Sequence, residues 1–188
     1  MEALSSSAIS PVQRSRAVAE LETSREAFFE ATKGLSAAQW RFQPSAGQWS
    51  IAECCEHVAI VEAQALKRIA AEVLQAPADP TKRAQVKLTD DAIVPTALNR
   101  ANRLQAPEHL LPTQRETPEN LVKELLQHRA NTLAFVGSTQ ENLRAHFLEH
   151  PLLGVSDTYQ WVLLISGHMR RHTAQVEEIK SDPRFPKE

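Results

Sequence analysis

Apolar side chains recur every three or four residues over four long stretches of the chain, the spacing that places them on one face of an α-helix. Each stretch opens with a side chain that can cap a helix. The caps are Ser10, Ser50, Thr117, and either Ser156 or Asp157. The pattern therefore predicts helices over residues 11–34, 50–75, 118–137 and 157–180.

The segments between these helices are short or rich in proline. Residues 77–118 contain six prolines, which predicts a long crossover with a short helix at most, over residues 91–106. Residues 140–149 are expected to form a short irregular helix, and no pair of strands is visible. Four long helices with one long crossover between the second and the third predict an all-α four-helix bundle. The 188 residues are expected to form a single domain, residues 1–188, with residues 1–10 as a loose tail.

Charge and composition restrict the partners. A net charge of −2 gives no electrostatic reason to bind nucleic acid or an anionic membrane. The longest apolar run, residues 161–165, is far shorter than the ~20 residues of a membrane span. No secretion signal is visible near the first residues, and the adjacent Cys54 and Cys55 are poorly placed to bridge to each other. We therefore expect a cytoplasmic protein with reduced thiols, which act in packing unless one of them lines a pocket.

Two histidines stand on the inward stripe of the last predicted helix. His168 and His172 are four residues apart, so they lie on one face with Cβ atoms roughly 6 Å apart. They interrupt an apolar row of Trp161, Ile165, Val176 and Ile179. Two such imidazoles can bind one divalent metal ion, and His57, beside the apolar stripe of the second helix, is the best third ligand. Three protein ligands leave a position open for water or substrate, whereas the plainer alternative is a pair of hydrogen-bonded core histidines.

The other histidines are weaker candidates. His146 and His150 are also four residues apart, but Pro151 disfavours helical geometry at His150. His128 lies on the apolar row of the third helix and is interpreted as a core residue or an outer partner of the site. His109 in the crossover is expected to face solvent.

Four charged side chains are candidates for proton transfer or substrate binding near such a centre. Glu53 and Glu56 precede His57, and Glu177 lies on the last helix, so each could carry a proton. Arg171 could pair with an anionic group of a substrate. Each has a plainer interpretation, because such residues are typical of a solvated helix face, a surface salt bridge or, for Glu53, a capping box.

Five short segments, in this order and spacing, resemble the DinB-like superfamily, which includes the DinB and YfiT-like metal-dependent enzymes. They are residues 35–44 (LSAAQWRFQP), residues 47–53 (GQWSIAE), His57-Val58, His150-Pro151 with Gly154, and residues 168–176 (HMRRHTAQV). The resemblance implies an up-down-down-up bundle and a three-histidine site, which carries over to His57, His168 and His172. It also implies one divalent ion (nickel, zinc or iron), a small-molecule substrate and a homodimer. Characterised relatives include S-transferases that use low-molecular-weight thiols, and many others are described only as hydrolases.

Three hypotheses for the function follow. The first is a metal-dependent enzyme that activates a low-molecular-weight thiol or water for attack on a small molecule. The second is a non-catalytic bundle that binds metal or a small molecule, as a sensor or scavenger. The third is an interaction module with structural histidines, which a measurement of metal content separates from the other two.

Overall fold

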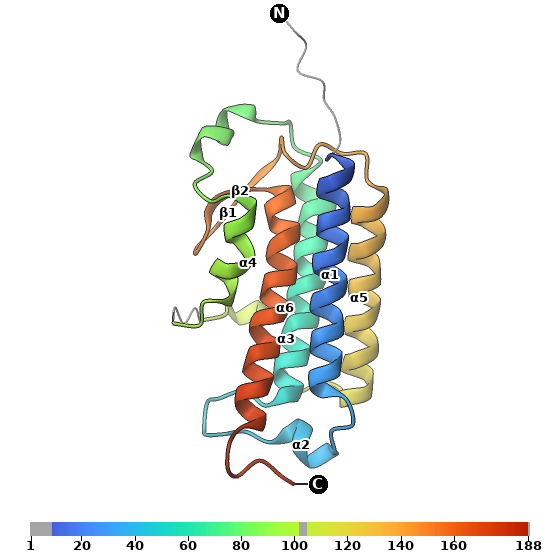
Figure 1. Ribbon diagram of the computed structural model, residues 1–188, viewed down its shortest axis with the longest axis vertical. Coiled ribbons are helices and arrows are strands. Elements are labelled where there is room, and N and C mark those ends of the chain that lie inside the picture. The colour runs from blue at the N-terminus through green and yellow to red at the C-terminus, as the bar shows by residue number, and fades with distance from the viewer. Residues whose placement is uncertain (1–8, 102–104, 188) are drawn as a thin grey trace, which may run out of the picture.

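Four long helices lie side by side in the computed structural model, which describes residues 9–101 and 105–187 (Figure 1). They are α1 (Pro11–Thr32), α3 (Ile51–Arg68), α5 (Pro118–Ser138) and α6 (Thr158–Lys180). α1 and α6 run in one direction and α3 and α5 in the other, so the order along the chain is up-down-down-up (Figure 1). Around the bundle, α6 packs between α1 and α3, and α5 packs on the other side of α3. The predicted four-helix bundle is confirmed, with one small hairpin added.

The helices begin where the capping residues predict. The side-chain oxygens of Ser10 and Ser50 each accept a hydrogen bond from the backbone N–H three residues later. The side chain at that later position, Gln13 or Glu53, accepts in turn from the backbone N–H of the serine. Asp157, the second of the two predicted caps, accepts from a backbone N–H in the first turn of α6. α1 ends at Thr32, slightly before Gly34, which takes a φ of +72° and lets the chain leave the helix axis.

The long crossover between α3 and α5 contains short helical pieces. α3 continues into a π-helical turn, η1 (Ile69–Val73), so the predicted helix over residues 50–75 is present with its last turn widened. The crossover then forms η2 (Pro80–Gln85), α4 (Asp90–Leu98) and η3 (Glu108–Leu110), while a short α2 (Ala37–Arg41) joins α1 to α3. The short helix predicted over residues 91–106 is confirmed in its first part, as α4, which packs against α6, and residues 102–104 of that range lie outside the described residues.

The segment before α6 is a β-hairpin, so the helix predicted over residues 140–149 and the expected lack of strands are both wrong. β1 (Phe147–His150) pairs antiparallel with β2 (Gly154–Asp157). Pro151 disfavours a helical conformation at the residue before it. Gly154, at φ +68°, takes the left-handed conformation that lets the chain turn back. Pairing between the strands then satisfies backbone groups that a frayed helix would leave open.

An ion pair lies inside the bundle core. Arg129 of α5 is fully buried, and its Nε and Nη2 donate to the two carboxylate oxygens of Glu62 on α3 at 2.6 and 2.9 Å. Its Nη1 donates to the Ser24 hydroxyl at 2.8 Å and to the Leu21 carbonyl, both on α1. One guanidinium thus joins three helices through charge-assisted hydrogen bonds that are shielded from water.

α4 comes into close contact with α6 at Gly167. A Cβ atom at this position would lie 2.8 Å from Ala97 Cβ and 3.3 Å from Val94 Cα, closer than packed atoms normally approach. Gly167 directly precedes His168 on the inward stripe of α6. The crossover can therefore lie against α6 at this point only because Gly167 has no side chain.

Gly167→Ala is expected to lower the free energy of unfolding by about 1 kcal/mol. Overpacking costs roughly 1–3 kcal/mol, while replacing glycine inside a helix regains about 0.5–1 kcal/mol. Gly137 in α5 is the matched control, because a Cβ there would meet nothing within 4 Å. Gly137→Ala is therefore expected to raise stability by about 0.5 kcal/mol. Urea titration measures both, and shifts of the same sign and size would contradict the close contact at Gly167.

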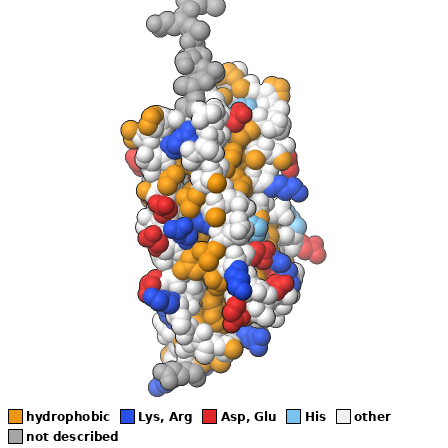
Figure 2. All heavy atoms as spheres, turned by 90° about the vertical axis from the view of Figure 1, so that its right-hand side faces the viewer, with side chains coloured by type: hydrophobic (Ala, Val, Ile, Leu, Met, Phe, Trp, Pro, Cys, Tyr) orange, Lys and Arg blue, Asp and Glu red, His pale blue; other side chains and the backbone are white. Residues whose placement is uncertain are grey.

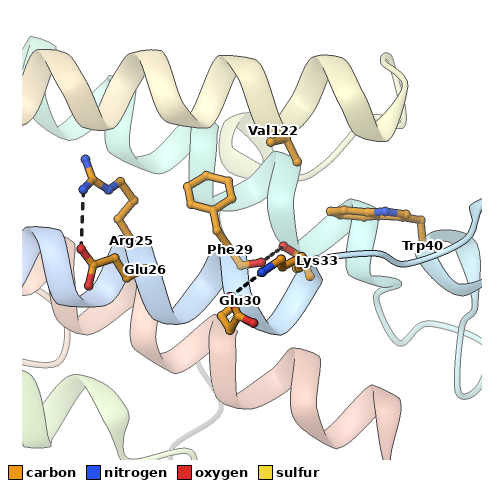
Figure 3. Close-up of a pocket in the computed structure, with 8 residues that line it drawn as sticks. Arg25, Glu26, Phe29, Glu30, Lys33, Trp40 and Val122 are labelled. Carbon is orange, nitrogen blue, oxygen red and sulfur yellow. Dashed lines mark hydrogen bonds and ion pairs between the residues drawn. The ribbon is translucent and has the colours of Figure 1, made fainter.

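The side of the bundle on which α1 and α5 lie carries a stripe of apolar side chains along the long axis (Figure 2). A groove of roughly 440 Å³ opens there, with Phe29, Trp40 and Val122 among its walls (Figure 3). Its charged side chains pair with one another, at 3.9 Å between Arg25 and Glu26 and at 3.5 Å between Lys33 and Glu30. The groove therefore offers apolar surface with compensated charges.

In the part of the chain that the structure describes, no helix combines the length and the hydropathy that crossing a bilayer requires.

Candidate metal centre

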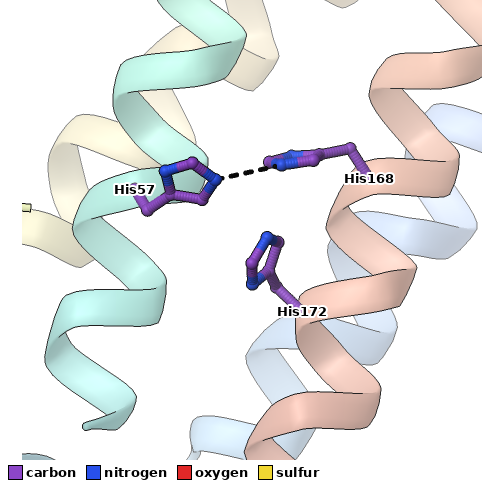
Figure 4. A group of neighbouring side chains, drawn as sticks. All are labelled: His57, His168 and His172. Carbon is purple, nitrogen blue, oxygen red and sulfur yellow. Dashed lines mark hydrogen bonds between the residues drawn. The ribbon is translucent and has the colours of Figure 1, made fainter. Parts of the chain in front are cut away.

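Three histidines from two helices point into a common space between α3 and α6 (Figure 4). His57 lies in the second turn of α3, and His168 and His172 lie one turn apart on α6. One ligand nitrogen from each ring lies within 4.8 Å of those of the other two. The structure thus brings together the three side chains that the sequence singled out, and no second cluster of this kind occurs among the described residues.

The spacing of the ring nitrogens fits a metal ion. His57 Nε2 and His168 Nε2 are 3.2 Å apart. Two nitrogens at about 2.0–2.1 Å from a tetrahedral zinc-like ion are about 3.3–3.4 Å apart, so these imidazoles stand close to the separation of two ligands of one ion. Without an ion, the same approach is a hydrogen bond from one ring to the other. A hydrogen bond would explain only the approach of His57 to His168, whereas one ion would explain the convergence of all three rings.

In two of the three rings, a protein oxygen holds the nitrogen that faces away from the cluster. His57 Nδ1 lies 2.8 Å from the Leu110 carbonyl oxygen, and His172 Nδ1 lies 3.0 Å from Gln175 Oε1. Because these oxygens only accept, Nδ1 carries the proton in both rings and the Nε2 lone pair is left for a ligand role. Arg100 Nη1 lies 3.5 Å from the same Gln175 oxygen, which supports this orientation of the amide. Partners of this kind fix the tautomer of metal-binding histidines.

Burial favours the neutral form of the imidazoles. His57 and His172 are 4% and 5% exposed, and His168 is partly buried. Burial lowers the pKa of all three rings, and the neighbouring rings and Arg171 lower the pKa of His168 and His172 further. At His57 the Leu110 carbonyl opposes this effect without reversing it. Neutral imidazole is the form that binds a metal ion, so the donor set and its surroundings suit one.

An indole ring closes one side of the cluster. The Trp49 ring centroid lies 4.7 Å from that of His57 and 6.0 Å from that of His172, and the Trp49 and His172 rings stack at 23°. Trp49 directly precedes the helix cap Ser50, so the capping box that starts α3 also places the indole. The ring shields the imidazoles from water on this side and puts a fluorophore next to them.

The carboxylates considered as proton carriers are engaged by other groups. Glu56 is fully buried and accepts from the backbone N–H groups of Thr113 and Gln114 at 3.0 and 2.8 Å. Glu53 accepts from the Ser50 N–H at 2.8 Å and from the Gln114 side chain at 2.9 Å. Burial raises the pKa of Glu53, but these hydrogen bonds outweigh it and the pKa is lowered. Loop and cap donors therefore occupy the oxygens of both carboxylates.

Arg171 and Glu177 also have partners away from the three rings. Arg171 Nη1 donates to the carbonyl oxygens of Ala97 and Asn99 at 3.2 and 2.7 Å, at the C-terminal end of α4. A cation is favourable there because the last carbonyls of a helix carry partial negative charge. Glu177 is exposed, as the plainer prediction of a solvated helix face has it, and accepts from Lys180 at 3.0 Å. Arg171 thus helps to hold α4 beside α6.

The remaining histidines stay outside the cluster. His128 on α5 lies 3.4 Å from Glu124, and His109 is exposed, as predicted. His150 ends β1 and His146 precedes that strand, so these two are not one helical turn apart. The sequence predicted that His146 and His150 are a poor metal-binding pair because they would lie at a frayed helix end. They are instead separated along a β-hairpin segment.

The two cysteines are core residues. Cys54 and Cys55 are fully buried beside the apolar side chains of α3. Burial raises the pKa of both thiols, to about 12 for Cys55. Buried thiols with a raised pKa are inert, which agrees with the packing interpretation and leaves neither of them facing an accessible pocket.

Three parts of the site were not predicted from the sequence, namely Gln175, Trp49 and the Leu110 carbonyl. Gln175 stands three residues after His172 on one helix, a spacing at which side chains meet, so this partner could have been found. Trp49 and the Leu110 carbonyl reach the rings through the paths of two connecting segments. No local pattern indicates those paths, because they depend on where the segments pack.

A four-helix bundle with three inward imidazoles defines a class of protein whose core can hold a divalent ion. The chain belongs to the DinB superfamily, whose sequence model matches residues 20–176 of this chain, a range that contains all three histidines. Over 163 residues the chain is 31% identical to the uncharacterised protein YuaE of Bacillus subtilis (strain 168), covering 86% of this chain and 93% of YuaE. The resemblance stated from the sequence is confirmed.

A solved structure shares the fold. YfiT from Bacillus subtilis matches with a TM-score of 0.56 over 92% of this chain and 89% of its own, at 15% sequence identity. That protein is described as a probable metal-dependent hydrolase with an unusual four-helix bundle topology.

Proposed function

We propose that the protein is a divalent-metal-dependent enzyme acting on a small molecule at the centre formed by His57, His168 and His172, with hydrolysis as its reaction class. The observation that carries the proposal is the convergence of three imidazole nitrogens within 4.8 Å of one another. The description of YfiT as a probable metal-dependent hydrolase supports the reaction class. Nickel and zinc are the ions that we expect, because imidazole suits both.

The chemistry follows from an all-imidazole donor set. A divalent ion held by the neutral rings of His57, His168 and His172 would supply Lewis acidity, which would bring the pKa of a bound water or thiol toward neutrality. The protein holds the three donors uncharged through burial, orients His57 and His172 by their Nδ1 partners, and excludes water on the side of Trp49. His168 is the partly buried member, so we place the approach of the substrate on its side.

Transfer of a small thiol is the second candidate reaction. The same Lewis acidity would favour a thiolate, which is a strong nucleophile at neutral pH. Cys54 and Cys55 are fully buried and have raised pKa values, so the sulfur would have to come from a separate low-molecular-weight thiol. This dependence on an added thiol separates the two reactions in an assay.

The first step of the test is metal binding. Purified protein titrated with Ni²⁺ is expected to bind about one ion per chain, with quenching of the Trp49 fluorescence because the indole lies 4.7 Å from the His57 ring. Trp49→Phe should remove most of the quenching and retain the ion. A protein that binds no Ni²⁺, Zn²⁺ or Fe²⁺ would overturn the proposal and leave the histidines with a structural role.

The second step is turnover. The metal-loaded protein is assayed on a panel of activated esters and amides, each with and without added cysteine as a model thiol. We expect activity that a chelator removes and that the metal restores, and a requirement for cysteine would assign thiol transfer. Activity that survives chelation would contradict a metal-dependent reaction, and metal binding without turnover on any substrate would favour a sensor or scavenger.

A further inference from the structure

We propose that Glu56 is a positioning residue for the candidate metal centre. It holds residues 110–114, the Leu110 loop, where the Leu110 carbonyl oxygen fixes the ring of His57. The proposal rests on the proposed function because it concerns the same centre. It assigns Glu56 a role through His57 in place of the proton transfer considered from the sequence.

The first link joins the loop to the ligand. His57 Nδ1 donates to the Leu110 carbonyl oxygen at 2.8 Å, and Nε2 of the same ring faces His168. A backbone carbonyl accepts but never donates, so its position selects both the ring orientation and the tautomer that leaves Nε2 free. If this carbonyl moved away, Nε2 would compete with Nδ1 for the single proton of the neutral ring. The geometry of His57 therefore depends on whatever holds the Leu110 loop.

The second link joins the loop to α3. Glu56 Oε1 accepts from the Thr113 N–H at 3.0 Å and from the Thr113 hydroxyl at 2.9 Å, and Oε2 accepts from the Gln114 N–H at 2.8 Å. Arg115 Nε lies 3.3 Å from Oε1. Hydrogen bonds to a buried carboxylate are strong, and Glu56 is the residue directly before His57. Glu56 thus anchors the loop at the position directly before His57, the proposed metal ligand whose ring the loop orients.

The third link is the conformation of the loop itself. Gln114 has a φ of 56°, the left-handed region that non-glycine residues rarely occupy. Its backbone N–H binds Glu56, and its side-chain Nε2 binds Glu53 Oε1 at 2.9 Å. A backbone in this region persists when its surroundings over-determine it. The two carboxylates of α3 therefore impose the loop conformation, and Glu56 contributes the contacts to the backbone.

The variant that tests this role is Glu56→Gln. The amide keeps the shape of the side chain but replaces one acceptor oxygen by an NH₂ group, which must then face a donor of Thr113 or Gln114. Glu124→Gln is the matched control. It removes a carboxylate charge that Arg115 contacts at 2.8 Å in the same region, and it leaves the three loop-to-Glu56 hydrogen bonds intact.

The decisive measurement is the tautomer of His57 in metal-free protein, read from ¹⁵N NMR of the imidazole nitrogens. Wild-type protein and Glu124→Gln are expected to show His57 protonated at Nδ1. Glu56→Gln is expected to show exchange between the two tautomers, together with Ni²⁺ affinity about 10- to 100-fold weaker. An effect of charge alone would weaken Ni²⁺ binding and leave the tautomer unchanged, and that result would overturn the positioning role.

Two further outcomes also decide the matter. An identical change in Glu124→Gln would overturn the proposal, because the effect would then be general to the region. If Glu56→Gln does not fold, Thr113→Val removes only the hydroxyl donor, and we expect a smaller shift toward tautomer exchange. An unchanged His57 spectrum in that variant would overturn the proposal. The NMR comparison needs no metal, so it stands even if wild-type protein binds no Ni²⁺ and the proposed function fails.

Discussion

His168→Ala is expected to weaken the binding of Ni²⁺ or Zn²⁺ by about 100-fold or more. Structural zinc sites with four ligands bind with roughly 10–16 kcal/mol, or about 3 kcal/mol per ligand, which corresponds to about 100-fold in affinity. His57→Ala is expected to have a similar effect, because the two Nε2 atoms lie 3.2 Å apart and would serve one ion. Competition titration against a chromophoric chelator measures both affinities.

His128→Ala is the control for the loss of a histidine outside the cluster. His128 lies on α5 next to Glu124, so this variant should bind metal as the wild type does. Wild-type affinity in His168→Ala would remove His168 from the centre. Wild-type affinity after alanine substitution of each of the three rings in turn would show that the ion binds elsewhere.

Arg129→Met is expected to lower the free energy of unfolding by about 3–5 kcal/mol, because it leaves Glu62 as an uncompensated charge in the core. The guanidinium is fully buried and Glu62 is 2% exposed, so water cannot replace the lost partner. Small domains have about 5–15 kcal/mol of stability in total, which makes this a large fraction. Urea unfolding followed by circular dichroism measures the loss.

The double variant Glu62→Leu with Arg129→Met separates the loss of a favourable pair from the exposure of an unpaired charge. We expect it to recover most of the stability, because a well-packed apolar pair often replaces a buried ion pair without loss. Lys33→Met, which breaks an exposed pair at 3.5 Å, should change stability by less than about 1 kcal/mol. A double variant no more stable than Arg129→Met would contradict this account.

Features that depend on spacing along one helix could be predicted from the sequence. The capping box of Ser50 and Glu53 marks the start of α3, and the four-residue spacing places His168 next to His172. His57 could be nominated because it lies beside an apolar stripe. Its approach to His168 requires α3 and α6 to be neighbours, which the stripe favours without specifying the partner.

Features that depend on the paths of the connecting segments could not be predicted. The hairpin of residues 147–157 lacks the alternation that marks a strand, and its pairing rests on the turn at Pro151 and Gly154. The Leu110 carbonyl reaches His57 because the buried carboxylate of Glu56, on the same helix as His57, holds the Leu110 loop. Such contacts join residues more than fifty positions apart, so no local periodicity reports them.

The separation of His57 and His168 by 111 positions has a consequence for the assembly of the protein. Two of the three proposed ligands lie on the last bundle helix in chain order, and they meet the third only after that helix has docked. A partly folded chain therefore offers an ion at most one pair of rings. We expect ion uptake to follow folding, unlike in zinc fingers, where the ion drives it. The bound ion would then stabilise the bundle by mass action, because it binds the folded chain and not the unfolded one.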